Sequence, residues 1–571
     1  MSSVFNPLAP VGNTALAQFD VVVIGSGAGG GAVTNVLCAN GAKVLVLEAG
    51  PNYFLGLDDG SQTPSTLFSN DEIKLDSRNF IVPDPTVEPR SWRTDDSVDR
   101  MIVGDVQSLP KTVGGGAAHA DLKMPRFLPQ DFQLGTLLGD VPGASFADWP
   151  VQYDELEPFY AYAEKIIGVQ GTAGAFPREG ARSTAFPMPP GLQAYFSSKI
   201  AGGLTSLGYT PFPYPMAINS QPYDGRPACA DCGFCSGFPC PSGAKGSPPV
   251  TTLRRALLSG NCLVLPGTRA VQIVVSGSSV TGVVAIGPDG KRQTFSAANY
   301  VVAASPIEDA RLLLLSDPGG AGVGNSSGMV GRNLTFHLQT QAIGVFEERL
   351  HGHRSRAVDT GFGDFRGVPN DPNHPLGGIV EISAGEGPVA EASFYARVLK
   401  MLVGFDGARF KRLMRQSPGR DRAIALVLQA EDAPQTTNRV DLDPGVVDLD
   451  GLPVARVTYQ NHAFELGARD FYSPKLLDIL GASGARWAAI VPQDQIPGSA
   501  HIMGTLRFGD DATASVCDKN GRFHDVGNLF CADGALFPTS SGFNPTMTII
   551  ALATRVGAAL VAPANPESAL V

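Results

Sequence analysis

The sequence predicts an α/β chain, α+β overall, that contains a doubly wound, Rossmann-like nucleotide-binding domain. Three observations lead to this prediction: an apolar strand at residues 19–24, a glycine-rich loop directly after it, and a second apolar strand at residues 43–47. At 571 residues the chain is too long for one ordinary core, so we expect two domains or one domain with a large insertion.

The first strand, FDVVVI at residues 19–24, is a near-continuous apolar run of the kind that a parallel strand buried on both faces requires. The loop at residues 25–30 fits G-x-G-x-x-G, and a helical pattern then extends from Ala32 to Leu37. The second strand, residues 43–47, ends in Glu48. These elements form a complete βαβ unit and predict a dinucleotide site; the alternative is a glycine-rich turn that binds no ligand.

Four residues of this unit have separate expected roles. Gly25 permits the tight turn, Gly27 allows a pyrophosphate to approach the backbone, and Gly30 allows helix and strand to pack closely. Glu48 is expected to accept a ribose hydroxyl. Further along the chain, apolar residues alternate from Ala270 to Ile286, which predicts strands there.

Composition argues against several classes of function. The net charge of −11 and the pI near 5.3 argue against a nucleic-acid or anionic-membrane surface, because both need clustered Lys and Arg. The first residues lack the basic and apolar regions of a signal peptide, and no apolar run reaches the roughly 18 residues that span a bilayer. Half of the cysteines stand in apolar contexts, as in a reduced protein, so we expect a cytoplasmic location, or a periplasmic one reached by co-export with a partner subunit.

Three C-terminal segments carry a family resemblance: HIMGTLRFG at residues 501–509, NLFCADG at 528–534 and FPTSSGFNPT at 537–546. Together with the N-terminal glycine motif they resemble the glucose-methanol-choline (GMC) family of FAD-dependent oxidoreductases. VGGGAAH at residues 113–119 and the segment 300–315 also resemble that family. On this resemblance FAD is favoured over NAD as the dinucleotide.

Two further segments narrow the resemblance, DWPVQYDELEP at residues 148–158 and NSQPYDGRP at 219–227. They are most similar to the bacterial branch that includes the catalytic subunits of flavin glucose dehydrogenases and sugar 3-dehydrogenases. The resemblance implies a flavin domain built from both ends of the chain and a substrate domain on an antiparallel sheet. The expected division is an N-terminal extension (1–17), an FAD-binding domain (18–150, 215–335 and 495–571) and a substrate-binding domain (151–214 and 336–494).

The resemblance also implies the site residues, with His501 as the catalytic base and Asn544 as its partner. Oxidation of an alcohol removes a hydroxyl proton and a carbon-bound hydride, and an imidazole with a pKa near 6.5 can take the proton at neutral pH. An asparagine amide can hold the oxygen without titrating. Taken alone, a loop histidine or an Asn-Pro turn would carry no such meaning. The remaining expected cofactor contacts are Gly114, Gly115, His119, Val271, Asp533, Gly534, Pro545 and Thr546.

Three residues near the expected site leave alternatives open. Ser305 stands where the family commonly has a glycine, which puts the flavin contacts of that turn in question. His119 lies in the loop where some sugar oxidases of the family attach FAD covalently, but its alanine neighbours differ from that pattern. His337 either lines the pocket or is a packed core histidine.

The stretch CADCGFCSGFPC contains Cys229, Cys232, Cys235 and Cys240. Its spacing is that of a ferredoxin-type run with one residue added before the last cysteine, and Pro241 follows as in that motif. In the resembling glucose dehydrogenase subunits three cysteines of this region hold a [3Fe-4S] cluster, and Cys229, Cys235 and Cys240 match them, with Cys232 spare or a fourth ligand. Disulfides or free thiols, and a structural zinc, are the alternatives.

We therefore expect FAD-dependent oxidation of a CH–OH group of a sugar or another alcohol. The hydride goes to flavin N5, His501 is the base, and the electrons pass to an external acceptor. The expected partners are a cytochrome or a small chaperone-like subunit. An oxygen-using alcohol, sugar or sterol oxidase without an iron-sulfur cluster is one alternative, and a noncatalytic flavoprotein or electron-transfer subunit is another.

Overall fold

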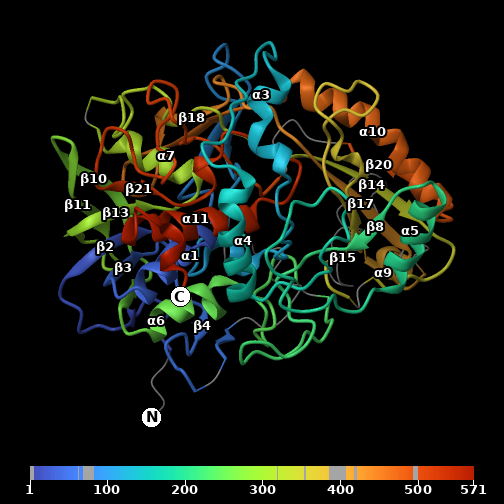
Figure 1. The fold of residues 1–571 in the computed structure, drawn as a ribbon, viewed down its shortest axis with the longest axis horizontal. Coiled ribbons are helices and arrows are strands. Elements are labelled where there is room, and N and C mark those ends of the chain that lie inside the picture. The colour runs from blue at the N-terminus through green and yellow to red at the C-terminus, as the bar shows by residue number, and fades with distance from the viewer. Residues whose placement is uncertain are drawn as a thin grey trace.

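The computed structural model shows two lobes, one on a largely parallel sheet and the other on an antiparallel sheet (Figure 1). In Figure 1 the parallel-sheet lobe is on the left and the antiparallel-sheet lobe on the right. The structure describes residues 5–61, 63–67, 83–233, 235–317, 319–352, 355–384, 407–416, 421–492 and 499–571.

The largely parallel sheet has the strand order β1-β9-β3-β2-β13-β21, and β2 lies between β3 and β13. The predicted strand at residues 19–24 is confirmed as β2, and the second predicted strand is confirmed as β3. Only β1, at the edge, runs antiparallel to its neighbour. The strands are β1 (Val11–Gly12), β2 (Phe19–Ile24), β3 (Val44–Leu47), β9 (Cys262–Leu265), β13 (Ala297–Val302) and β21 (Leu529–Cys531).

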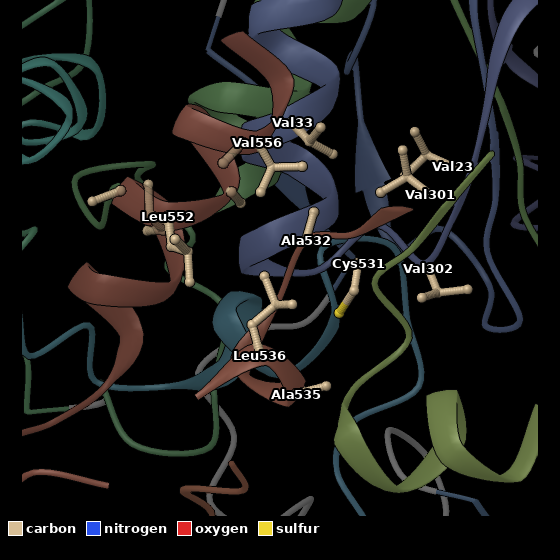
Figure 2. Packing of buried hydrophobic residues seen from close by; sticks show 14 of the residues in the cluster. Val23, Val33, Val301, Val302, Cys531, Ala532, Ala535, Leu536, Leu552 and Val556 are labelled. Carbon is tan, nitrogen blue, oxygen red and sulfur yellow. The ribbon is translucent and has the colours of Figure 1, made fainter. Parts of the chain in front are cut away.

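Helices α1 (Ala28–Ala39) and α11 (Thr546–Val561) pack against each other beside this sheet. Figure 2 shows Val33 of α1 close to Val556 of α11, with Ala532 and Val301 of the sheet region nearby. These four side chains are fully buried, and they belong to one large apolar cluster whose burial stabilises the lobe. The first and last parts of the chain therefore share one core.

The apolar pattern predicted that helix α1 begins at Ala32, but the helix begins four residues earlier, at Ala28. Glycines occupy this first turn, and a Cβ on Gly29 would lie 1.9 Å from the carbonyl oxygen of Ala532. The glycines thus carry no side-chain signal, yet they let the helix start directly against the neighbouring strand end.

The second lobe is an antiparallel sheet with the strand order β20-β14-β17-β16-β15-β8. Helices α5 (Tyr195–Ser206) and α10 (Ala463–Ala482) contribute to one buried apolar cluster with this sheet. The fold class predicted from the sequence, a doubly wound domain with an antiparallel sheet, is confirmed. The strands are β8 (Pro211–Pro213), β14 (Leu338–Val345), β15 (Val358–Phe362), β16 (Val380–Ala384), β17 (Ala423–Ala430) and β20 (Trp487–Ile490).

Smaller sheets complete the described part of the chain. The alternation predicted at 270–286 is confirmed as the hairpin of β10 and β11. The three-stranded sheet contains β10 (Arg269–Ser276), β11 (Ser279–Ile286) and β12 (Arg292–Phe295). The four-stranded sheet contains β6 (Arg90–Arg93), β7 (Ile102–Gly104), β18 (Arg439–Val447) and β19 (Pro453–Thr458), and β4 (Phe54–Leu55) pairs with β5 (Ser65–Thr66).

The remaining helices include α4, which packs against α11. The first turn of α4 is closed by a capping box between Gln152 and Glu155.

None of the helices in the described ranges is long and apolar enough to cross a membrane. The division into the predicted domains stays a prediction, and part of its substrate segment, residues 353–354, 385–406, 417–420 and 493–494, lies outside the described residues. These helices are α2 (Gly115–His119), α3 (Leu134–Leu138), α4 (Tyr153–Ile167), α6 (Thr252–Leu258), α7 (Pro306–Leu315) and α9 (Gly407–Gln416), with 3₁₀ helices at Pro129–Gln133, Pro248–Val250, Asp364–Arg366, Gly534–Leu536 and Pro566–Ala569.

Candidate active site

A cavity of ≈ 630 Å³ brings together most of the residues that the sequence predicted for the site. Its volume lies within the range of ligand and cofactor sites, about 300–1,000 Å³. Both predicted catalytic residues, His501 and Asn544, line it. Of the predicted cofactor residues, Gly30 and Gly114 do not line it. The predicted cofactor residues that line the cavity are Gly25, Gly27, Glu48, Gly115, His119, Val271, Asp533, Gly534, Pro545 and Thr546.

The glycine loop has the geometry that its sequence predicted. Gly25 has φ +98°, in the left-handed region that favours glycine, and a Cβ on Gly30 would come within 2.1 Å of the Gly25 carbonyl oxygen. A Cβ on Gly27 would meet no atom within 4 Å, so this residue faces open space at the cavity. The loop therefore presents bare backbone to a ligand at the N-terminus of α1.

Glu48 is buried at the end of β3 and is held by the glycine loop. Its carboxylate accepts hydrogen bonds from the backbone N–H of Ser26 (3.1 Å), the Ser26 hydroxyl (2.6 Å) and the N–H of Gly50 (2.8 Å). Burial raises the pKa of Glu48 even though these bonds act in the opposite direction. Gly114 supports the same corner, because its N–H donates to the Ser26 hydroxyl at 2.9 Å. Glu48 lines the cavity, and its role toward a ribose stays a prediction.

Ser305 has φ 84° and ψ 145°, a backbone conformation that favours glycine. Its N–H donates to Asp533 Oδ2 at 2.9 Å, and the other oxygen of Asp533 accepts from the N–H of Ala535 at 2.8 Å. Burial, together with the adjacent Asp533, raises the pKa of Asp309 well above its usual range. The turn therefore keeps its geometry next to the cavity, at the cost of backbone strain in Ser305.

His501 and His337 form a buried pair at the catalytic end of the cavity. Their Nδ1 atoms lie 2.9 Å apart, and Nε2 of His337 lies 3.1 Å from the carbonyl oxygen of Ser540. Burial, reinforced by the proximity of His337 and Lys123, lowers the pKa of His501 well below 6.5. Burial likewise lowers the pKa of His337 to about 4. Both rings are therefore neutral at pH 7, whereas the sequence had led us to expect an ordinary pKa for His501.

The hydrogen bonds of this pair assign a proton to each ring. The Ser540 carbonyl can only accept, so His337 carries its proton on Nε2, and its Nδ1 accepts a hydrogen bond from Nδ1 of His501. The remaining nitrogen of His501, Nε2, is then unprotonated, and its lone pair accepts a long hydrogen bond from the amide of Asn544. This nitrogen lies 3.5 Å from Nδ2 of Asn544 and is oriented to take a proton.

Asn544 is held by two residues that the sequence did not indicate. Its Oδ1 accepts a hydrogen bond from the Tyr214 hydroxyl, and its Nδ2 donates to Glu381 Oε1 at 2.8 Å. Because a carboxylate only accepts, Glu381 determines which way the amide faces, with Nδ2 on the side of His501. Glu381 is 1% exposed, and a charged residue within the apolar strand β16 is a signal by which it could have been found.

Lys123 completes this polar group. Its Nζ donates to Glu381 Oε2 at 2.5 Å and lies 3.2 Å from Asp121 Oδ2. Burial alone would lower the pKa of Lys123, but these two carboxylates more than offset it and the pKa is raised. Lys123 therefore keeps its positive charge beside the histidine pair.

His119 lies at the end of α2, with its side chain inside the protein. The residue is 3% exposed, its Nε2 lies 3.1 Å from the Thr112 hydroxyl, and its backbone carbonyl accepts from the N–H of Gly237. Burial, and secondarily the charge of Lys245, lowers the pKa of His119 to about 4. This residue thus links the cavity wall to the cysteine loop.

The cysteine loop adjoins this wall. Its residues Ser236 and Gly237 line the cavity, whereas Cys229, Cys232, Cys235 and Cys240 do not, and these four cysteines form no disulfide. The buried Lys245 ties the loop down, because its ammonium donates to the carbonyl oxygens of Ala120, Cys235 and Phe238.

The thiols of this loop do not gather as a mononuclear site requires. A tetrahedral zinc at about 2.3 Å from each sulfur needs the sulfurs to converge closely. Within the described ranges, the group of metal-ligating atoms that lie within 4.8 Å of one another is Asp309, Cys531 and Asp533, and the loop cysteines form no such group. An iron-sulfur cluster spreads its thiolates over several metal atoms and does not require that convergence.

The cavity fits a dinucleotide such as FAD. The open space at Gly27 admits a pyrophosphate, and the N-termini of α1, α7 and α11 all border the cavity. The first turns of α1 and α11 carry no acidic residue, so their backbone N–H groups favour an anionic group. The histidine pair and Asn544 border the same cavity, so a substrate held by them would face such a cofactor.

Two parts of the chain, residues 214–339 and 434–553, match family models described as GMC oxidoreductase. The chain is 31% identical over 562 residues to 2-methyl-1,2-propanediol dehydrogenase of Mycolicibacterium austroafricanum, covering 95% of each protein. It is 29% identical to the fructose dehydrogenase large subunit of Gluconobacter japonicus, over 95% of this chain and 97% of that one. Among solved structures, pyridoxine 4-oxidase from Mesorbium loti is similar with a TM-score of 0.61 at 16% identity, over 95% of this chain and 98% of that one. At that identity the likeness shows a shared fold alone.

Proposed function

The chain belongs to the GMC oxidoreductase family and is an oxidoreductase acting on CH–OH donors, and from that premise we propose that His501 and Asn544 catalyse the FAD-dependent oxidation of a polyhydroxylated alcohol or sugar. FAD is the cofactor typical of this family. The observation that supports the proposal is the pair of neutral histidines, in which His337 takes the Nδ1 proton of His501 as a hydrogen bond and so keeps Nε2 of His501 unprotonated beside Asn544.

The residues of the site divide the reaction between them. Asn544 donates a hydrogen bond to the substrate oxygen from Nδ2, on the side that Glu381 leaves facing His501. His501 takes the hydroxyl proton at Nε2, and Lys123 favours the developing negative charge on the oxygen. The chemistry that bound FAD supplies is acceptance of the carbon-bound hydride at N5. The residues that we propose to hold FAD are Gly25, Gly27, Glu48, Asp533 and Thr546.

We favour an external electron carrier over oxygen as the final acceptor, which makes the protein a dehydrogenase. The support is the cysteine loop, which carries four thiols and contributes Ser236 and Gly237 to the cavity wall. Cys229, Cys235 and Cys240, with Cys232 as spare or fourth ligand, are the proposed ligands of an iron-sulfur cluster, which would supply one-electron transfer. Iron and acid-labile sulfide assays on anaerobically purified protein test this, and a protein that contains flavin alone would favour the oxidase alternative.

The experiment for the catalytic proposal is the His501→Ala variant under anaerobic conditions. We expect substrate-driven loss of the visible flavin absorbance to be abolished while FAD stays bound, because the alcohol no longer has a base. A variant that bleaches at the wild-type rate would remove His501 from the mechanism. The same assay on the wild-type protein, across a panel of alcohols and sugars, tests the alternative of a noncatalytic flavoprotein, which would bleach with none of them.

The polyhydroxylated substrate class takes its support from the named relatives, which act on a diol and on fructose. The cavity offers the charged and amide side chains of Lys123 and Gln339 close to the catalytic pair, as a polyol would require.

A further inference from the structure

Lys123 and Gln339 line the cavity beside the catalytic pair. Lys123 is positioned by a bridge of its backbone to Met216, and its charge contributes to the lowered pKa of His501. Gln339 follows His337 by two residues and lies on β14. Both side chains are thus fixed by the elements that also place the base.

Among the residues that the structure describes, the ammonium of Lys123 has two acceptors for its three N–H groups. It has three N–H groups, of which one is directed at Glu381 (2.5 Å) and one at Asp121 (3.2 Å). Its side chain is 18% exposed, and the residue lines the cavity. One N–H is therefore left for a group bound in the cavity.

The amide of Gln339 is oriented by a chain of hydrogen bonds that ends on Glu381. Glu381 can only accept, so Gln429 directs its Nε2 there at 3.1 Å and turns its Oε1 to Gln339. Nε2 of Gln339 donates to that oxygen at 2.9 Å. This leaves Oε1 of Gln339 as an acceptor that receives no hydrogen bond from the parts of the chain that the structure describes.

A cationic donor and an amide acceptor, joined through Glu381, complement a hydroxyl group, which both accepts and donates. We propose that Lys123 and Gln339 bind a second substrate hydroxyl, on the carbon next to the one that is oxidised, and so select vicinal diols and polyols over monohydric alcohols. The inference rests on the proposed function, since the first hydroxyl is the one held by His501 and Asn544. An alcohol without the second hydroxyl leaves both groups unpaired in a largely buried site, which is the situation that discriminates strongly between substrates.

The test compares substrates that differ by one hydroxyl, 1,2-propanediol with 1-propanol and a hexose with its deoxy analogue. The measured quantity is the ratio of kcat/KM between the two substrates of each pair. It is compared among the wild type, Gln339→Leu and Lys123→Met. The control is Gln133→Leu, because Gln133 is an exposed glutamine outside the cavity. We expect the wild type and the control to prefer the extra hydroxyl by at least about tenfold, and the two cavity variants to lose most of that preference.

Gln339→Leu removes no charge, so this variant keeps the test decisive if Lys123→Met disturbs folding. Equal kcat/KM for both members of each pair in the wild type, or an unchanged ratio in both cavity variants, would overturn the second-hydroxyl site while the proposed oxidation stands. A wild type that oxidises neither member of any pair would instead overturn the proposed function, and the hydroxyl site with it.

Discussion

Nδ1 of His337 lies 2.9 Å from Nδ1 of His501, with the two rings nearly perpendicular at 83°. His337 is in turn anchored to the backbone carbonyl of Ser540, so the protonation of the base is determined by a main-chain group. A backbone carbonyl does not titrate and cannot be exchanged by mutation. The tautomer of His501 is therefore a property of the fold, and His337 transmits it.

His337 is accordingly expected to act as a positioning residue. His337→Phe keeps a ring of similar size but removes the acceptor for Nδ1 of His501, so the rate constant for anaerobic flavin reduction should fall by about 10–100-fold. His337→Asn should recover part of the loss, because its amide oxygen can accept that hydrogen bond. Stopped-flow absorbance measures both.

The matched control for this pair is His462→Asn. His462 caps α10 through a hydrogen bond from the N–H of Phe464, and it does not line the cavity. Its replacement should leave flavin reduction at the wild-type rate. Equal rates for His337→Phe and His337→Asn would show that His337 has only a packing role.

The lowered pKa of His501 predicts an unusual pH dependence. A base with the ordinary pKa of about 6.5 would lose roughly tenfold of its unprotonated form between about pH 8 and about pH 5.5. Because burial, His337 and Lys123 lower the pKa of His501 well below that value, the ring stays unprotonated as the pH falls through this range. We expect kcat/KM to change by less than about twofold, measured with circular dichroism as the check on folding. A tenfold fall with a midpoint near 6.5 in folded protein would contradict this.

Local sequence patterns predicted the geometry of the glycine loop, but they did not indicate the residues that hold Asn544. Gly25, Gly27 and Glu48 belong to one short βαβ unit, in which strand period and glycine spacing determine the geometry. The partners of Asn544, in contrast, come from distant parts of the chain: Tyr214 follows β8 and Glu381 lies within β16. Such a convergence depends on sheet order and register, which no local pattern specifies.

His119 predicts that FAD is held without a covalent bond. Its imidazole is buried, and Nε2, a nitrogen to which a flavin could be attached, is already hydrogen-bonded to the Thr112 hydroxyl. Precipitation with acid should release all the flavin into the supernatant, from wild type and His119→Ala alike. Flavin fluorescence that remains with the wild-type polypeptide on a denaturing gel, and disappears in the variant, would contradict this.

Ser305 is the position where one substitution should stabilise the fold. At φ 84° and ψ 145° a side chain is strained, typically by about 1–3 kcal/mol, whereas glycine adopts this conformation freely. The hydrogen bond to Asp533 comes from the backbone N–H and survives the change. Allowing about 1 kcal/mol for the greater freedom of glycine in the unfolded chain, Ser305→Gly should raise the free energy of unfolding by about 1 kcal/mol. Ser305→Ala keeps the Cβ and should gain nothing, so urea unfolding of the two variants side by side isolates the strain. A glycine variant about 1 kcal/mol less stable than the alanine variant would show that the turn is unstrained.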